Sequence, residues 1–554
     1  MKNYLLAFMV LLSAGIKAQT PNIASDDISY ELLQDCEIQL GRLSNSFHLA
    51  IKPLQRGQVL RYLDEVKGQD STSRYMQGSL RFLERDNALL RDTHVFESKR
   101  KVWFPNNINL FALKNENYSL VVNPVFNIGF GSDRISTNNF SYNTRGVEIY
   151  GTVFKKIGFY SYTTDNIVMP LNYVKEYVGM QRVFPTANLT KPLDNGGYGF
   201  LQSRGYVSYA PIQPLSFQFG HDRQFIGDGV RSFIMSDFGR EFLFAKANFN
   251  HKKVNFMFLG GQMINQFGRF YNVAAEKKYI ATHHLSLNLG KKFNIGLFET
   301  IVFSRTDSNG VNAGYDFSYA NPLAFYRVVE HGLNSHDNAM LGINYKYFPI
   351  KKVMLYGQFV LDEFKLNEVL ARTGWYANKY ALQVGVKVVS PFKLDGLSLR
   401  FEYNRIRPYT FMHFNRAQSL VHNNIPLSHP LGANFEEFIF VARYALNSKL
   451  VVSVNAMYYK KGYDKGNKNY GGDIANKEYL SAVSIYGNYI GQGQLASVHF
   501  VETHVAYALL HNLFVDVSVL YRNSVSDSSK YHYGTQAISL GLRYNIGRSN
   551  FMML

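Results

Sequence analysis

Residues 512–522 read NLFVDVSVLYR, and the polarity of this stretch alternates from one residue to the next. In an extended strand, successive side chains point to opposite faces. One face would carry Leu513, Val515, Val517, Val519 and Tyr521, opposed by Asp516 and Ser518. Residues 398–404, SLRFEYN, repeat the pattern. Such alternation is typical of strands with one face in lipid and the other in a polar lumen.

Similar segments recur along the chain from about residue 118 and number about 18, an even count as in single-chain bacterial barrels. They lie near residues 118–130, 144–156, 157–165, 202–210, 214–222, 240–250, 253–262, 280–290, 293–303, 338–348, 352–362, 379–390, 395–405, 434–446, 449–461, 494–508, 511–523 and 535–546. The C-terminal segment, ISLGLRYNI at 538–546, resembles the terminal strand motif of outer-membrane barrels.

The connectors between these segments alternate between short and long, for example 155–158 and then 166–201. Outer-membrane barrels have short periplasmic turns and longer outer loops. With a periplasmic N-terminus, every long connector falls outside. The sequence therefore predicts an all-β fold, a transmembrane antiparallel β-barrel with both termini in the periplasm, located in the cell outer membrane.

The chain before the barrel has a different pattern. Residues 1–18 combine Lys2 with a short apolar run from Leu5 to Leu12 and a small residue, Ala18, before the expected cleavage point, which predicts a cleavable signal peptide. Within 19–115, the stretches 28–44, 56–68 and 71–92 carry apolar residues at helical spacing. We expect a small helical periplasmic region there that serves as a plug, a plinth or a bundle at the barrel mouth, and a barrel over 116–554. Cys36 is the one cysteine and is expected on a helix face as a small hydrophobe.

The amino-acid composition limits the classes of partner that the protein is expected to contact. Aromatic residues make up 15 % and charged residues 18 %, which favours lipid-facing strands, and the formal charge is +18. A basic chain attracts acidic polymers. Export disfavours nucleic acid, which leaves acidic surface glycans and the lipid surface of the outer membrane as partners; the alternative is that basic residues only decorate turns beside anionic lipid.

Three charged clusters are the candidate functional residues. The first, 220–241, includes Arg223, Arg231, Ser236 and Asp237 in one outer connector, and charges of both signs there can bind sugar hydroxyls or carboxylates. The alternative is a loop folded into the lumen and pinned by its own salt bridges. The second, 317–347, includes Glu330, Asp337 and Asn338, with no strong metal spacing between His331 and His336.

The third cluster, 356–366, places Gln358, Asp362 and Glu363 at an outer strand end. Adjacent strand residues point to opposite faces, so the two carboxylates are not expected to act jointly. A lumen salt bridge to an arginine of the first cluster is predicted instead. No sequence motif for an enzyme, a metal or a phosphate appears, so we predict a non-enzymatic protein without cofactor or metal.

The three clusters together, HDRQFIGDGVRSFIMSDF, NPLAFYRVVEHG…HDNAMLGINYKY and LYGQFVLDEF, resemble the Wzi-type capsule-assembly family. With FHLAIKPLQRGQV at 47–59, they look most like its Bacteroidetes branch, which includes the gliding-motility protein RemB; Leu54 departs from the aromatic expected there. The matching positions are Gly227, Gly229, Arg231, Ser232, Ser236, Asp237, Glu330, Asp337, Asn338, Gly342, Gln358, Asp362 and Glu363.

The resemblance implies an 18-stranded outer-membrane barrel that binds surface polysaccharide and supports capsule or exopolysaccharide assembly or attachment. Capsule-export or gliding machinery would be further partners. Two alternatives remain from the sequence. One is a gliding-motility or adhesion protein without glycan binding, and the other is a diffusion porin, because a barrel of this size can enclose an aqueous channel.

Overall fold

The computed structural model describes residues 21–67, 73–91, 108–187, 190–265, 275–306, 311–475 and 477–548. The predicted signal peptide at 1–18 lies outside these residues. The division of the chain at 115 and 116 remains a prediction, although the described helices before residue 91 and the first long strand at Tyr118 are compatible with it.

Within the described residues, 18 long antiparallel strands form a closed barrel, which confirms the predicted fold class. Closure comes from pairing of the last strand with the first, in the register Ala537 opposite Asp133. The strands are β3 (Tyr118–Asp133), β4 (Asn139–Val153), β5 (Ile157–Met169), β7 (Tyr198–Ile212), β8 (Leu215–Asp222), β10 (Phe242–His251), β11 (Val254–Asn265), β12 (Glu276–Leu289), β13 (Phe293–Phe303), β14 (Asn338–Tyr347), β15 (Val353–Glu363), β16 (Lys379–Val389), β17 (Leu397–Ile406), β20 (Phe435–Ala445), β21 (Leu450–Tyr463), β22 (Gln494–Leu510), β23 (Leu513–Ser526) and β24 (Tyr533–Tyr544).

The barrel wall has an apolar outside and a polar inside. On β17, Arg400 and Glu402 are buried in the lumen while Phe401 between them is exposed. On β23, Ser518 is buried while Val517 and Val519 are exposed. Charged groups inside and bare apolar side chains outside fit a wall that lipid surrounds. No helix in the described parts of the chain is long and apolar enough to cross a membrane.

The connectors follow the predicted sides, but their lengths alternate less regularly than predicted. The first outer connector was expected to span 131–143, yet β3 and β4 continue their pairing to Ser132 and Asn139, which leaves only 134–138. The inner connector 390–396 is longer than that outer turn. The polar residues at the outer ends of β3 and β4 are therefore part of the strands, because backbone pairing there continues beyond the last apolar side chains.

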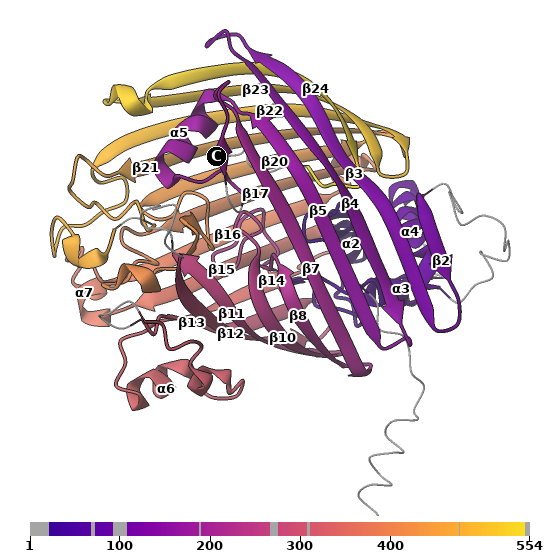
Figure 1. Ribbon diagram of the computed structural model, residues 1–554, viewed down its shortest axis with the longest axis horizontal. Helices are drawn as coiled ribbons and strands as arrows, with labels where there is room; N and C mark the ends of the chain where they lie inside the picture. Colours follow the sequence, from indigo (N-terminus) through magenta and orange to yellow (C-terminus); the bar gives the residue numbers. More distant parts are fainter. Residues whose placement is uncertain are drawn as a thin grey trace, which may run out of the picture.

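The N-terminal region is helical, as expected, and sits at the end of the barrel with the inner connectors. It contains α2 (Ser29–Leu40), α3 (Arg56–Val66) and α4 (Arg74–Asp86). Backbone bonds join it to those connectors, from Leu43 N–H to the Lys291 carbonyl (2.8 Å) and from Lys352 N–H to the Ile38 carbonyl (2.7 Å). Figure 1 shows α2 within the ring of strands and α3 and α4 at the same end, opposite α5, α6 and α7.

Local sequence explains how these helices begin and end. The side chain of Ser73 accepts a hydrogen bond from Met76 N–H at the start of α4, and Gly41 ends α2 in a left-handed conformation. Apolar faces of the three helices pack together, and the buried thiol of Cys36 lies among them as predicted.

Shorter elements complete the fold. They are β1 (Ile51–Lys52), η1 (Ala88–Leu90), β2 (Phe111–Lys114), α5 (Asn172–Gln181), β6 (Lys191–Pro192), β9 (Phe225–Ile226), η2 (Phe317–Ala320), α6 (Tyr326–Gly332), α7 (Leu366–Leu370), η3 (Pro391–Lys393), η4 (Arg416–Gln418), β18 (Val421–His422), β19 (Ile425–Pro426), η5 (Tyr479–Ser481) and η6 (Ser529–Tyr531).

Candidate functional site: a filled lumen beneath an outer cap

The inner half of the lumen holds helix α2, which we call the inner plug. Its sequence, SYELLQDCEIQL, places carboxylates opposite an apolar stripe. The apolar stripe packs on α3 and α4, and the carboxylates face cations of the barrel wall. Glu31 lies 2.6 Å from Lys387 Nζ and 3.3 Å from Arg400 Nη2, and Asp35 lies 2.7 Å from Lys387 Nζ. Burial alone would raise the pKa of Glu31, but the charges of Lys387 and Arg400 lower it well below its usual range.

A buried triad joins the inner plug to the first charged cluster. Lys346 Nζ on β14 lies 3.0 Å from Glu37 Oε2 and 3.1 Å from Asp228 Oδ1. All three side chains are almost completely shielded from solvent. The Gln34 side chain also donates to the Asp228 carbonyl oxygen at 3.0 Å. The cluster at 220–241 therefore reaches down the lumen to meet the helix.

The outer half of the lumen holds residues 225–236 and 409–434, which we call the outer plug. Strand β9 of this plug pairs with β1 from the N-terminal region, Ile51 opposite Ile226, and Gly227 N–H donates to the Ala50 carbonyl at 2.7 Å. Of the two interpretations of 220–241, a sugar-binding outer loop and a loop folded into the lumen, the structure matches the second, with partners that come mainly from the barrel wall. Sugar binding by these residues stays a prediction.

Wall residues hold the backbone of the 225–236 segment. Glu402 on β17 accepts hydrogen bonds from the backbone N–H groups of Val230 (2.7 Å) and Arg231 (3.1 Å). Gln358 on β15 accepts from Phe233 N–H and donates to the Ile226 carbonyl oxygen, both at 2.8 Å. These contacts satisfy buried backbone groups that would otherwise be costly to leave unpaired.

Two glycines allow this close approach. A Cβ at Gly227, whose φ is +149°, would lie 2.6 Å from Gln358 Nε2. A Cβ at Gly229 would lie 2.5 Å from Glu402 Oε2. The motif GDG in the first cluster is therefore explained by backbone docking onto the wall.

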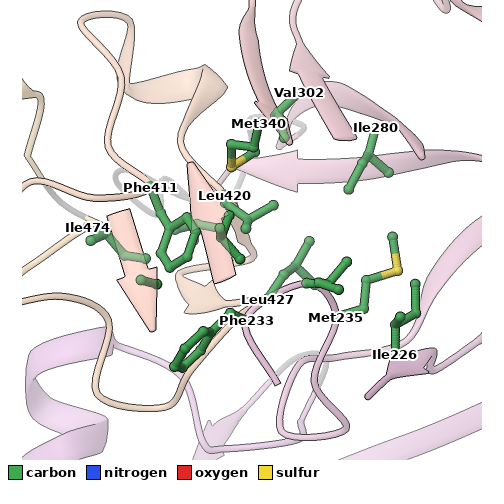
Figure 2. Packing of buried hydrophobic residues seen from close by; sticks show 14 of the residues in the cluster. Ile226, Phe233, Met235, Ile280, Val302, Met340, Phe411, Leu420, Leu427 and Ile474 are labelled. Carbon is green, nitrogen blue, oxygen red and sulfur yellow. The ribbon is translucent and has the colours of Figure 1, made fainter. Parts of the chain in front are cut away.

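The outer plug is fixed chiefly by apolar packing. Figure 2 shows Phe233, Met235, Leu427, Leu420 and Phe411 pointing toward one another inside the barrel. Inward residues of the strands complete the cluster, among them Ile280, Val302 and Met340.

The predicted residues of the first cluster lie in this plug or at its edge. The Arg231 guanidinium contacts Glu437 at 3.2 Å, and Arg223 Nε lies 3.5 Å from Glu241. The buried Ser236 donates its N–H to the Leu427 carbonyl oxygen at 2.8 Å. Burial raises the pKa of Asp237, against the charges of Lys52 and Arg223.

The second cluster fastens an outer connector instead of forming an open site. Asp337 accepts hydrogen bonds from both terminal guanidinium nitrogens of Arg305, each at 2.8 Å. It also accepts hydrogen bonds from the Tyr319 hydroxyl at 2.7 Å and from the Gln418 side-chain amide at 2.8 Å. Asn338 donates to the Gln418 carbonyl oxygen at 3.0 Å. Glu330 pairs with Arg327 at 2.8 Å within α6.

The third cluster corrects the expectation about Asp362 and Glu363. A bulge interrupts the β15–β16 register here, so both carboxylates approach Lys379 Nζ, at 3.9 and 3.0 Å. Asp362 also accepts the Phe411 N–H at 2.7 Å. The cationic partner of both carboxylates is thus Lys379 on the barrel wall, and not the arginine of the first cluster that the sequence predicted.

Among the wall residues that hold the plugs, sequence reasoning singled out Gln358 but missed several others. Glu402 lies on the polar face of 398–404, and the signal for it was a carboxylate next to Arg400 on the face predicted to line the lumen. Glu437, Gln383 and Lys346 are further inward positions of the same kind. Among the described residues, no group of three or more His, Cys, Asp or Glu side chains is placed to hold a metal ion.

Two outer connectors form a cap over the plugged lumen, and we call residues 364–378 and 483–489 the outer cap. They are joined through their backbones: Gly487 N–H donates to Thr373 and Asn488 N–H to Gly374, both at 2.9 Å. Tyr486 and Tyr489 are exposed on one segment, and Arg372 is exposed on the other. The cap thus presents aromatic rings and a guanidinium to the outside on a fixed backbone.

Comparisons by sequence find no relative: no family model matches the chain, and no curated protein matches it. Solved structures do match. Wzi, an outer-membrane protein involved in group 1 capsule assembly in Escherichia coli and described as a carbohydrate-binding β-barrel, aligns over 96 % of this chain and 100 % of its own, with a TM-score of 0.58 and 11 % identity.

More distant barrels align as well. The outer-membrane protein OprD from Pseudomonas aeruginosa covers 77 % of this chain and 94 % of its own, with a TM-score of 0.42 and 12 % identity. OccAB1 from Acinetobacter baumannii covers 77 % and 95 %, with a TM-score of 0.40 and 9 % identity. On the strength of the Wzi alignment and its own closed 18-stranded sheet, the chain has the fold of an outer-membrane β-barrel like Wzi.

Proposed function

We propose that this barrel binds polysaccharide at the outer cap and supports the assembly or attachment of a capsule or exopolysaccharide at the cell surface. The observation that carries the proposal is the cap itself, with Tyr486, Tyr489 and Arg372 exposed on two paired segments. Aromatic rings offer a rigid apolar surface for the C–H faces of sugars. A guanidinium can bind the carboxylate of an acidic sugar with two hydrogen bonds.

Two further observations support the proposal. The structurally similar Wzi is described as carbohydrate-binding. In addition, the plugs bury most of the predicted site residues, so a long polymer meets the loops before it meets the lumen. Most of the predicted residues then support the outer plug, as Gln358 and Asp362 do, or fasten the connector between β13 and β14, as Glu330 and Asp337 do. Their direct contact with glycan stays a prediction.

The test uses the full-length protein in nanodiscs, with polygalacturonate as an acidic probe and dextran as a neutral one. We expect Tyr486→Ala and Arg372→Ala each to weaken polysaccharide binding about tenfold, with the arginine effect confined to the acidic probe. Tyr118→Ala is the matched control, because Tyr118 is exposed at the inner end of β3. A deletion strain should also shed its surface polysaccharide. Absence of binding to both probes together with unchanged surface polysaccharide would contradict the proposal.

The pore alternative makes a different prediction. A diffusion porin needs an open lumen, whereas α2 and the outer plug lie across this one. We expect no stepwise conductance in planar bilayers. The gliding or adhesion alternative, like the placement in the RemB branch, stays a prediction, and reduced spreading of a deletion strain that keeps its polysaccharide would favour it.

A further inference from the structure

The outer connector between β13 and β14 folds back onto the outside of the barrel, and we call its residues 311–337 the wall loop. Along β12, Ile280, Thr282 and His284 point into the lumen, so the residues between them point outward. These outward residues would face lipid, yet they are buried. Tyr319 and Tyr326 of the wall loop cover Tyr279, Ala281, Ile301 and Phe303. Figure 1 shows α6 outside the ring of strands.

A polar pair fastens the wall loop to this surface. His283 and Glu299 lie opposite each other on β12 and β13 and are 3.2 Å apart. Glu299 accepts the backbone N–H groups of Tyr326 (2.8 Å) and Arg327 (3.0 Å), and the His283 ring stacks on Tyr326 at 4.5 Å. A carboxylate exposed to lipid on the outside of a barrel destabilises the folded protein. The wall loop avoids this destabilisation because it covers Glu299.

The height of this contact places the wall loop beside the membrane. Glu299 lies seven residues beyond the inner turn at 290–292. At about 3.3 Å per residue and a strand tilt of about 40°, this corresponds to roughly 18 Å along the membrane normal. The apolar band of an outer-membrane barrel is about 25 Å tall. The wall loop therefore meets the wall within the upper part of that band.

The far side of the wall loop carries four large exposed apolar side chains, with the exposed Arg327 and His331 beside them. Phe317, Leu323, Phe325 and Val328 are 81, 82, 71 and 72 % exposed. Neighbouring outward residues on the strands, Leu297, Leu341 and Ile343, are also exposed. The apolar surface of the loop thus continues the lipid-facing surface of the wall.

We propose that the wall loop is immersed in the outer leaflet, with Phe317, Leu323, Phe325 and Val328 in contact with lipid acyl chains. The occupant of this face is lipid because the loop replaces lipid on the strands at the height of the apolar band and presents a similar surface outward. This assignment is independent of polysaccharide binding. It makes the wall loop a membrane anchor beside the barrel, unlike the outer cap.

The test places a fluorophore at single cysteines in the full-length protein with Cys36→Ala, because Cys36 is the one cysteine of the chain. Leu323→Cys and Phe325→Cys report on the wall loop. Leu341→Cys on β14 is the lipid-facing reference, and Leu480→Cys on an outer connector is the aqueous control. In phosphatidylcholine bilayers with doxyl-labelled chains, we expect quenching at 323 and 325 to equal that at 341 and to exceed that at 480 several-fold. Quenching at 323 and 325 no greater than at 480 overturns the proposal.

A second measurement separates lipid from a protein partner. A photo-crosslinking residue at position 323 is activated in intact cells, in protein that retains heat-modifiable migration and is therefore folded. Adducts to lipid support the proposal. Adducts to another polypeptide, including a second copy of this chain, overturn it, because the same face would then be a protein interface.

Discussion

The inner and outer plugs fill the same lumen by different physical means. The inner plug contacts the wall through charges, with three wall cations, Lys346, Lys387 and Arg400, opposite carboxylates of α2. The outer plug contacts the wall chiefly through apolar side chains, with Phe233 and Leu427 in its centre (Figure 2), and has charged contacts at Asp228 and Arg231. A barrel interior is thus not uniformly polar. Each half of the wall matches the segment that fills it.

This difference has a structural reason. A helix that enters the barrel from the end with the inner connectors can satisfy its own backbone and needs only side-chain partners, which ion pairs supply. An irregular loop must have its backbone groups satisfied by others, which Gln358 and Glu402 do, while apolar packing supplies the net stabilisation. The plugs should therefore respond differently to mutation and to pH.

The largest effect is expected at the inner plug from Lys346→Met. The substitution leaves Glu37 and Asp228 buried without their shared cation, in a place where burial already raises the pKa of Glu37. Removing one partner of a buried ion pair costs about 3–5 kcal/mol in the free energy of unfolding. Urea unfolding in lipid vesicles measures it, with protease cleavage within α2 as a local readout.

Lys365→Met is the matched control for that experiment. Lys365 pairs with Glu368 at 3.3 Å on the exposed outer cap, where an ion pair contributes at most about 1 kcal/mol. Equal losses in the two variants would show that the buried triad does not hold the inner plug.

Leu427→Ala tests the outer plug by creating a cavity. Leu427 is almost completely buried in the apolar cluster, and truncation of such a leucine costs roughly 3 kcal/mol. We expect a lower free energy of unfolding and faster proteolysis of residues 409–434, with α2 still protected. Leu370→Ala, on the exposed part of the outer cap, should change stability by less than about 0.5 kcal/mol. Simultaneous release of both plugs would mean that they behave as one unit.

Sequence patterns predicted the strands better than the loops, and the plugs show why. Period-two alternation identified all the long strands and the faces of residues such as Phe401 and Glu402. Loops have no such period. The apolar run at 233–235 lies inside the barrel, whereas Leu323 and Phe325 lie outside it on the wall loop, and nothing in their local sequence distinguishes them. Their location depends on long-range partners, which a single sequence does not reveal.

Acidification should loosen the outer plug before the inner one. Burial, together with the charge of Arg240, holds the pKa of His422 well below its usual range, so His422 is neutral when folded. Its Nε2 lies 3.1 Å from the Glu241 carbonyl oxygen and its Nδ1 accepts from Ile264 N–H at 3.2 Å. Burial also lowers the pKa values of His413 and His429 to about 4.

The direction of the change in stability with pH follows from proton binding. The unfolded chain takes up protons on these histidines below about pH 6.5 and the folded chain does not, so stability falls as the pH drops from 6.5 toward 4. Glu31 of the inner plug, with its lowered pKa, loses its contribution only below about pH 4.5. Proteolysis at pH 7.5 and 5.0 should therefore accelerate at 409–434 more than at α2, and His422→Gln should reduce the difference. Faster cleavage at α2 than at 409–434 would contradict the prediction that acid loosens the outer plug first.

The smallest effect is expected at the β15 bulge, where a buried carboxylate of the wall holds the backbone of the outer plug. Glu363 is about one-third exposed and 3.0 Å from Lys379, so Glu363→Gln should cost less than about 1 kcal/mol. Asp362 is buried and accepts the Phe411 N–H, so Asp362→Ala leaves a buried donor unpaired and should cost about 1–3 kcal/mol. The same unfolding measurement compares them. If the two losses are equal, Lys379 alone holds the outer plug at this point; if Asp362 dominates, backbone capture of the loop matters more than charge, as elsewhere in the outer plug.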